Sequence, residues 1–255
     1  MACGYDTENS RRNSSGSPLT KSPSAELIVF CAGAVQSVVR GLVETHRRTS
    51  GNIIKIEPGT VGSIAQRVAE GAAGDVVIAT VDGLAALAEA GKVDGASIRD
   101  LGTLGVGVAV RTGAPKPDIR DVEAFRNSLL AAKSVVHGNP AKGGQSGIHI
   151  ATVLAQLGID KQLGPKLHIR DTSRECFADV AKGDIEIGLG QISEIIANSD
   201  VALAGPFPAA IQGGVTYSAA VLTTAKNKQE AAELIQYLTG PAAKNKFKAM
   251  GFAVN

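Results

Sequence analysis

The chain has 255 residues, 44% of them hydrophobic, and a formal net charge of +2 at pH 7. This length predicts one large or two modest globular domains. The lysines and arginines are scattered without a basic stripe, which argues against nucleic-acid binding, and no stretch reaches the ~20 apolar residues of a membrane-spanning helix.

Residues 1–25 are polar, rich in Ser, Asn, Arg and Pro, and lack an apolar period, which predicts a disordered leader. They contain no apolar signal-peptide core. Two interpretations stay open: a cytoplasmic protein, or a mature extracytoplasmic protein whose signal peptide has been removed. Cys3, followed by a Ser/Gly-rich stretch, would suit the lipid anchor of a bacterial lipoprotein, and it is the one membrane attachment that we expect.

The three cysteines show no CxxC spacing, so they predict neither a zinc site nor a disulfide framework. Cys31 lies in an apolar run and is interpreted as a small buried hydrophobic residue. Cys176 stands beside Glu175 and Phe177 in a predicted helix, where a reactive thiol is the alternative to a buried one.

Short apolar strands alternate with helices from residue 27 onward. Strand-like runs at 27–32, 53–56 and 75–79 are each followed by a turn and by apolar residues at helical spacing. Such alternation with short connections is typical of right-handed βαβ units, in which helices cover both faces of a parallel sheet.

Residues 104–110 form one longer extended segment of Gly and Val. Prolines follow at 115 and 117, so a change of sheet topology is expected in this region. A helix is then predicted over 122–131, and further strands over 134–137, 166–169, 185–190 and 217–223. The chain ends in two helices separated at Gly240-Pro241.

Three glycine-studded turns join strands to helices, around Gly33, at 59–63 and at 143–149. In the third and densest turn, Ser146 stands where a helix cap is expected. The first N–H groups of a helix have no partner within the helix and attract anions. The turns therefore predict a site for a carboxylate or another small oxyanion, although each alone is equally typical of an ordinary strand-to-helix connection.

The order of elements over about 27–252 resembles the periplasmic substrate-binding proteins, in the branch that includes the molybdate-binding proteins. The resemblance is carried by VFCAGA at 29–34, GTVGS at 59–63, GDVVI at 74–78 and AAELIQYLTGPAA at 231–243, with Gly251-Phe252. It implies an α/β fold of two lobes, each a mostly parallel sheet flanked by helices, with the ligand clamped between them. The chain would cross twice, so that the first lobe takes 26–107 and 209–255 and the second 108–208.

The resemblance also implies a periplasmic or other extracytoplasmic location, a small-molecule anion as ligand, and an ABC transporter permease as protein partner. Molybdate-binding members use a serine hydroxyl in each of the first two turns, and the matching positions here are Ala34 and Val61. A desolvated tetrahedral oxyanion needs all its hydrogen bonds. Losing both hydroxyls therefore shifts the expected ligand from molybdate or tungstate toward an organic acid.

The second half is more similar to a subgroup that includes aconitate isomerase, an enzyme that moves a proton along an allylic tricarboxylate. The segments concerned are GAPKPDI at 113–119, LLAAKS at 129–134, GGQSGIH at 143–149, QISE at 191–194 and GPFP at 205–208. Because fold and function separate readily, both a carboxylate-binding protein and an isomerase remain open, with the binding protein preferred.

Binding requires only N–H groups and hydroxyls at the three turns, aided by an arginine. The expected ligand-binding residues are Gly33, Ala34, Ser37, Gly62, Ser63, Gln145, Ser146, Gly147, Arg174 and Ser193.

An isomerase would also need an acid–base group, for which the candidates are Glu194, His149, His137 and Arg174, with Glu194 and His149 preferred. Both preferred residues have an ordinary alternative: Glu194 as compensation of a helix dipole, His149 as a solvated helix residue. No metal or cofactor is expected, because the four histidines lack ligand spacing and no Walker loop or complete GxGxxG signature is present.

Overall fold

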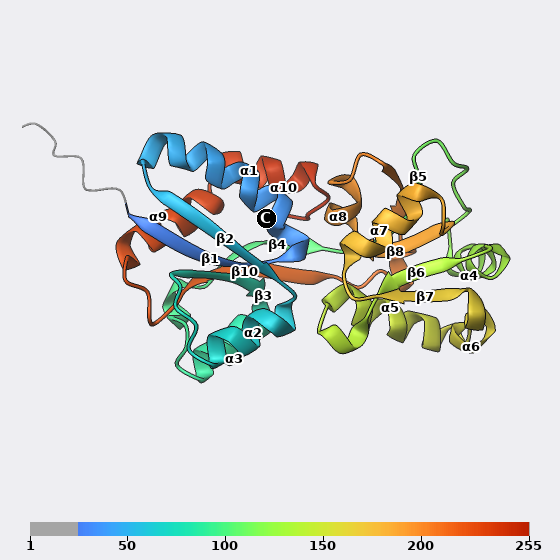
Figure 1. Cartoon of the computed structure of the whole chain (residues 1–255), viewed down its shortest axis with the longest axis horizontal. Coiled ribbons are helices and arrows are strands. Elements are labelled where there is room, and N and C mark those ends of the chain that lie inside the picture. Colours follow the sequence, from blue (N-terminus) through green and yellow to red (C-terminus); the bar gives the residue numbers. More distant parts are fainter. Residues whose placement is uncertain (1–24, 255) are drawn as a thin grey trace, which may run out of the picture.

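The structure is a computed structural model that describes residues 25–254. Two five-stranded sheets, each flanked by helices, form two lobes side by side along the long axis (Figure 1). The first lobe contains the sheet β2-β1-β3-β10-β4 and the second lobe the sheet β7-β6-β8-β5-β9. The expected two-lobed α/β fold is confirmed. Cys3 and residues 1–24 of the expected leader lie outside the described residues.

The first lobe is built from the two ends of the described chain, with its elements within 26–104 and 215–249. Its strands are β1 (Glu26–Ala32), β2 (Ile53–Gly59), β3 (Val76–Thr80), β4 (Arg99–Leu104) and β10 (Val215–Val221). Its helices are α1 (Gly33–Ser50), α2 (Val61–Ala69), α3 (Val81–Glu89), α9 (Lys228–Leu238) and α10 (Pro241–Ala249), with a 3-10 turn at Gly95–Ser97.

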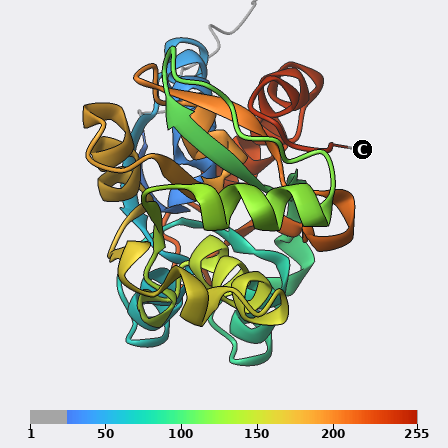
Figure 2. The same cartoon turned by 90° about the vertical axis from the view of Figure 1, so that its right-hand side faces the viewer.

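The second lobe is built from the middle of the chain. Its strands are β5 (Val106–Arg111), β6 (Val135–Gly138), β7 (Leu167–Arg170), β8 (Ile187–Gln191) and β9 (Val201–Pro206). Its helices are α4 (Val122–Ala131), α5 (Gln145–Gln156), α6 (Asp160–Leu163), α7 (Ser173–Lys182) and α8 (Ile192–Ile196), with 3-10 turns at Pro140–Lys142, Gly164–Lys166 and Ala209–Ile211. Figure 2 shows light-green α4 crossing the end of this lobe that faces the viewer.

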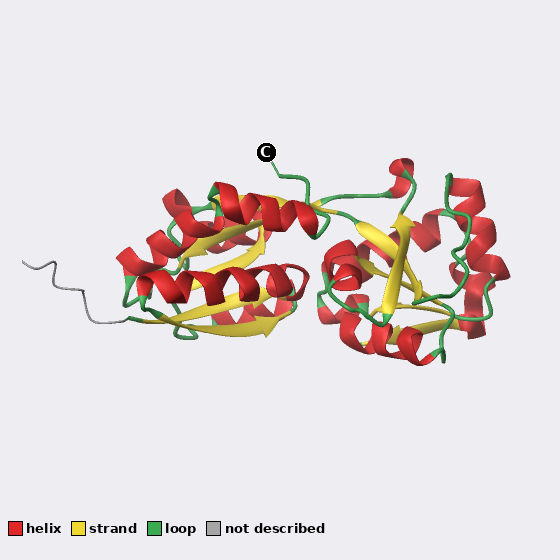
Figure 3. Ribbon diagram, turned by 90° about the horizontal axis from the view of Figure 1, so that it is seen from above, coloured by secondary structure: helices red, strands yellow, loops and turns green. Residues whose placement is uncertain are grey.

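Helix α1 shows how local sequence produces these elements. Its apolar residues at helical spacing, from Val35 through Leu42, are buried. Its last turn carries Arg47 and Arg48, whose positive charges are stabilised by the negative end of the helix dipole. Gly51 ends the helix in the left-handed conformation at φ 80°, with its N–H bonded to the Arg47 carbonyl. Helices of this amphipathic kind lie on both sides of each sheet (Figure 3).

Each sheet contains one reversed strand. β1 pairs in parallel with β2 and β3, whereas β10 runs antiparallel to β3 and β4. In the second sheet β6 pairs in parallel with β7 and β8, whereas β5 runs antiparallel to β8 and β9. The reversed strands β5 and β10 are the ones that directly follow the two crossings between lobes.

The extended segment predicted over 104–110 is present, and it is divided between the two sheets. β4 ends at Leu104 in the first sheet and β5 begins at Val106 in the second. At Gly105 between them, the carbonyl oxygen accepts the Ile192 N–H at 3.2 Å, and an added β-carbon would lie 1.9 Å from Gln212 Nε2. The pairing partners change across Gly105, and a strand pattern in the sequence cannot reveal that change.

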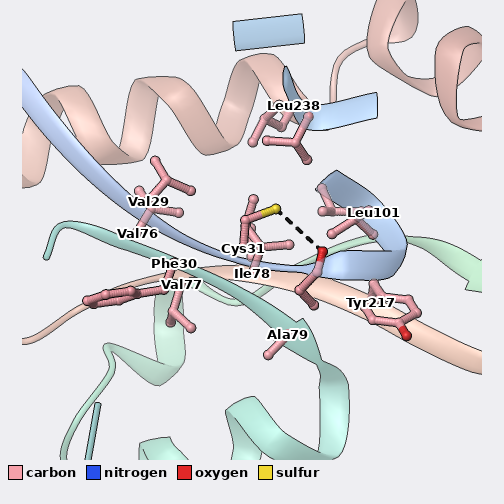
Figure 4. Close-up of a cluster of buried hydrophobic side chains, with 14 of the residues drawn as sticks. Val29, Phe30, Cys31, Val76, Val77, Ile78, Ala79, Leu101, Tyr217 and Leu238 are labelled. Atoms are coloured by element: carbon pink, nitrogen blue, oxygen red, sulfur yellow. Dashed lines mark hydrogen bonds between the residues drawn. The ribbon is translucent and has the colours of Figure 1, made fainter. Parts of the chain in front are cut away.

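In the core of the first lobe, Cys31 lies on the face of the sheet where Ile78 and Leu238 also lie, while Phe30 points to the opposite face (Figure 4). Cys31 is fully buried, and burial raises the pKa of its thiol to about 12, so its prediction as a small buried residue is confirmed. Cys176 is also fully buried, in a cluster of the second lobe, and burial raises its pKa to about 12, so the thiolate is disfavoured at neutral pH.

None of the described helices is both long and apolar enough to span a membrane.

Candidate functional site

A cavity of about 480 Å³ lies between the two lobes, and we call it the interlobe cavity. It is bordered where β1, β2, β6 and β8 end and the next helices begin, which is the general location of ligand sites in open α/β sheets. The lining residues from the first lobe are Ala32, Gly33, Ala34, Gln36, Pro58, Gly59, Thr60, Val61 and Tyr217. Those from the second lobe are Gly138, Asn139, Gly144, Gln145, Ser146, Gly147, Asp171, Thr172, Ser173, Arg174, Gln191 and Glu194.

Two long helices present uncapped N-termini to this cavity, one from each lobe, and the five-residue helix α8 begins there after Gln191, also without a side-chain cap. α1 starts after Ala32 and α5 starts after Gly144, and neither cap residue supplies a side-chain acceptor. By contrast, Thr60 accepts the Ser63 N–H at the start of α2, and Thr172 forms a capping box with Glu175 at the start of α7. The first N–H groups of α1 and α5 therefore remain available to an anion between the lobes.

Seven of the expected site residues line the interlobe cavity together. Ser146 is 7% exposed, and its hydroxyl makes no hydrogen bond within residues 25–254, so it is free to meet a ligand. Arg174 in the first turn of α7 is exposed and makes no ion pair with any described residue. The full set is Gly33, Ala34, Gln145, Ser146, Gly147, Arg174 and Glu194.

Gly62 and Ser63 are not among the lining residues of the cavity. The Gly62 N–H donates to the Gly143 carbonyl oxygen at 3.4 Å, and the Thr60 hydroxyl donates to the Lys142 carbonyl oxygen at 2.8 Å, so these two bonds join the lobes. The Ser63 hydroxyl donates to the Thr60 carbonyl oxygen at 3.0 Å within its own turn. The second turn contributes Thr60 and Val61 to the cavity instead.

Three other expected residues have different surroundings. Ser193 is fully buried, and its hydroxyl donates to the Ala34 carbonyl oxygen at 2.5 Å, which ties α8 to α1. His149 does not line the cavity: its Nε2 lies 3.0 Å from the Ile211 carbonyl oxygen, and its ring packs on Gly213 in the second crossing. Ser37 lies one turn into α1 and borders a neighbouring groove.

Glu194 brings a carboxyl group into a cavity otherwise suited to anions. Burial raises the pKa of this carboxyl above its ordinary value of 4.5, and a hydrogen bond from the Ser173 hydroxyl offsets part of the shift. Among the described residues no cation forms an ion pair with it. A β-carbon on Gly33 would lie 3.1 Å from Glu194 Oε1, so the absence of a side chain at Gly33 makes room for the carboxyl.

Gln191 and Tyr217 also line the cavity, and sequence reasoning missed both. The Gln191 Nε2 donates to Tyr217 Oη at 3.2 Å across the lobes, and both side chains are almost fully buried. Burial raises the pKa of Tyr217, and the charge of Glu194 adds to the effect. Gln191 is the last residue of a strand and lies next to the expected site residues Ser193 and Glu194. This position in the sequence could have identified it as a residue of the cavity. Tyr217 comes from the reversed strand β10, and no local signal marks it.

No group of three or more His, Cys, Asp or Glu side chains within residues 25–254 is arranged to hold a metal ion. What this cavity offers is free helix N–H groups, the Ser146 hydroxyl and one guanidinium, together with two carboxyl groups. The Asp171 carboxylate is paired with Lys142, whereas burial favours the neutral form of Glu194. Such a set is suited to holding a small anion and to moving a proton on it.

The fold and this cavity define a two-lobed solute-binding protein. Residues 27–253 match the family model described as bacterial extracellular solute-binding protein, and the chain belongs to this family.

Two relatives extend over nearly the whole chain. An aconitate isomerase of Pseudomonas sp is 29% identical over 238 residues, which is 91% of this chain and 88% of that protein. A molybdate-binding protein of Escherichia coli strain K12 is 25% identical over 231 residues, 90% of this chain and 89% of that one.

Solved structures show the same fold. The periplasmic molybdate-binding protein of Azotobacter vinelandii has a TM-score of 0.76 at 19% identity, covering 90% of this chain and 99% of that chain. The sulfate-binding protein of Mycobacterium tuberculosis H37Rv has a TM-score of 0.69 at 20% identity, covering 89% and 86%.

Proposed function

We propose that this protein is an extracytoplasmic solute-binding protein that clamps a small organic anion, a di- or tricarboxylate, for uptake through an ABC transporter. The observation that carries the proposal is the pair of uncapped helix N-termini, α1 from one lobe and α5 from the other, facing one cavity. A carboxylate held by both would bridge the lobes. The permease follows from the family, in which such proteins supply transporters.

Two features favour an organic acid over a metal oxyanion. Ala34 and Val61, which stand where molybdate-binding relatives carry serine hydroxyls, both line the cavity. The cavity volume of about 480 Å³ lies in the range of sites for small organic molecules, which is roughly 300–1,000 Å³.

The proposal is tested by thermal unfolding with a panel of di- and tricarboxylates, and with molybdate, tungstate and sulfate alongside. A ligand that binds only the folded protein raises its melting temperature with concentration. We expect stabilisation by one or more of the organic acids and little by the metal oxyanions. Stabilisation by molybdate, tungstate or sulfate alone would overturn the proposal.

A second function, an isomerase that carries out a 1,3-proton shift, is favoured by the position of Glu194. Glu194 would act in its ionised form, and its raised pKa makes this carboxylate a stronger base than an ordinary glutamate. The carboxylate would take a proton from an allylic carbon of the bound substrate, becoming a neutral carboxyl, and would return the proton at the other end of the allyl system as the double bond moves. The helix N–H groups would stabilise the enolate-like oxygen that forms in between. Glu194 lines the cavity whereas His149 does not, so we assign both transfers to Glu194.

Replacing Ser146 by alanine is expected to weaken binding of the carboxylate ligand by about 1 kcal/mol, because its free hydroxyl is placed to donate to the ligand. Isothermal titration calorimetry measures the change. Thr152→Ala is the matched control, since this exposed hydroxyl of the same helix bonds only to the Ile148 carbonyl. Unchanged affinity in Ser146→Ala would remove this hydroxyl from the ligand's contacts.

A further inference from the structure

A second cavity, of about 620 Å³, adjoins the interlobe cavity on the side of α1 and α7, and we call it the arginine groove. Four residues border both spaces, namely Gly33, Gln36, Arg174 and Glu194. The remaining lining residues of the groove are Ser37, Arg40, Phe177, Ala197, Asn198 and Ser199. The groove is therefore continuous with the proposed ligand site, and it draws on both lobes.

Two guanidinium groups face this groove from opposite lobes. Gly33, Gln36 and Arg40 fall on one face of α1 at spacings of three and four residues, and Arg174 lies in the first turn of α7. Neither arginine makes a hydrogen bond or an ion pair with any residue of the described part of the chain. Arg67 and Arg170, by contrast, each pair with a carboxylate of their own lobe.

The charge of the groove is not cancelled by acidic groups among its lining residues. Glu194 is the one carboxyl there, and burial raises its pKa, so it is neutral over a wider pH range than an ordinary glutamate. Two unpaired cations along one concave surface attract anions and repel each other until an anion lies between them.

The polar side chains of the groove add hydrogen-bond donors. Asn198 Oδ1 accepts the Asp200 N–H at 3.0 Å, which leaves the amide NH₂ of Asn198 available as a donor. The side chains of Gln36 and Ser37 make no hydrogen bond within residues 25–254. A guanidinium pair supplemented by amide and hydroxyl donors is the donor set that recognises carboxylates and other oxyanions.

We propose that the arginine groove is a second anion site, in which Arg40 and Arg174 together hold a carboxylate at the entrance to the interlobe cavity. The proposal rests on the proposed function for the class of ligand, but the site itself is separate. An anion bound there joins the first lobe to the second. It also concentrates anionic solutes beside the cavity that they enter, as charged clefts do.

The test is modification of arginine by phenylglyoxal, followed site by site by mass spectrometry, with inorganic sulfate and tricarballylate as probes. At saturating probe we expect modification of Arg40 and Arg174 to slow by about five-fold, as charge-assisted contacts occupy both guanidinium groups. Arg48 is the matched control, because it is an exposed arginine of the same helix outside the groove, and its rate should not change. In Arg40→Gln, protection of Arg174 by sulfate should be lost.

The outcomes separate this inference from the proposed function. If Arg40 reacts equally fast with and without either probe, the groove is not an anion site, even when tricarballylate protects Arg174 from within the interlobe cavity. That second result would still support carboxylate binding in the cavity. If sulfate protects both arginines but no carboxylate raises the melting temperature, the arginine groove is supported as an anion site and the proposed function in carboxylate binding is overturned.

Discussion

Replacing Gly147 by alanine is expected to lower the free energy of unfolding by about 2 kcal/mol and to abolish ligand binding. A β-carbon at this position would lie 2.5 Å from the Gly138 carbonyl oxygen and 3.0 Å from the carbonyl carbon. Both atoms belong to the backbone at the end of β6 and cannot turn aside as a side chain would. The start of α5 must therefore move, and its N–H groups move with it.

Chemical denaturation and calorimetric titration of the Gly147→Ala variant measure the two effects. Gly144→Ala is the control for stability, because Gly144 has φ −78° and its added β-carbon meets nothing within 4 Å. Wild-type stability and affinity in Gly147→Ala would show that α5 does not pack on the end of β6 as described.

Replacing Glu194 by glutamine is expected to abolish proton exchange on a bound tricarboxylate while leaving binding intact. If the protein is an isomerase, losing its general base lowers the rate by about 10²-fold or more. Nuclear magnetic resonance of cis- and trans-aconitate in deuterium oxide follows both exchange and isomerisation. Full exchange in Glu194→Gln would exclude Glu194 as the base. If the wild-type protein binds the tricarboxylate but catalyses no exchange, the isomerase function is excluded and the binding function remains.

The same variant tests the pH dependence of binding, whichever function holds. The wild-type affinity for an ionised carboxylate should fall by about ten-fold as the pH rises through the raised pKa of Glu194, because the carboxyl becomes a like charge. Glu194→Gln should bind tightly across this range. Glu89→Gln, at an exposed residue of α3, should keep the wild-type profile. An equally steep fall in Glu194→Gln would assign the titration to another group.

The stability of the ligand-free protein should also depend on pH through the ionisation of Glu194. Because the folded protein holds the Glu194 proton more tightly, the stability contributed by that proton is complete below pH 4.5 and is lost as the pH rises through the raised pKa. Denaturation curves of the wild-type protein and Glu194→Gln should therefore diverge as the pH rises above 4.5. Parallel curves would show that the carboxyl is not buried.

Local patterns were sufficient for most individual elements and for part of the site. The predicted helix over 122–131 coincides with α4, and the uncapped N-termini of α1 and α5 lie at two of the three predicted turns. Backbone N–H groups at a strand-to-helix junction depend on neighbours in the chain, so the junction can be recognised from sequence. His149 and Tyr217 show the limit, since the direction in which a side chain points depends on distant segments.

The sequence by itself determined the alternation of strands and helices, the buried Cys31 and the glycine turns, because periodicity and backbone freedom are local properties. Only the tertiary structure decided that Gly105 divides one extended segment between two sheets, that the Gly62 N–H bonds to the other lobe, and that Gly33 makes room for Glu194. It also brought Arg40 and Arg174 to one groove from opposite lobes. Each of these depends on contacts between residues far apart in the chain, and the way in which the two lobes meet sets those contacts.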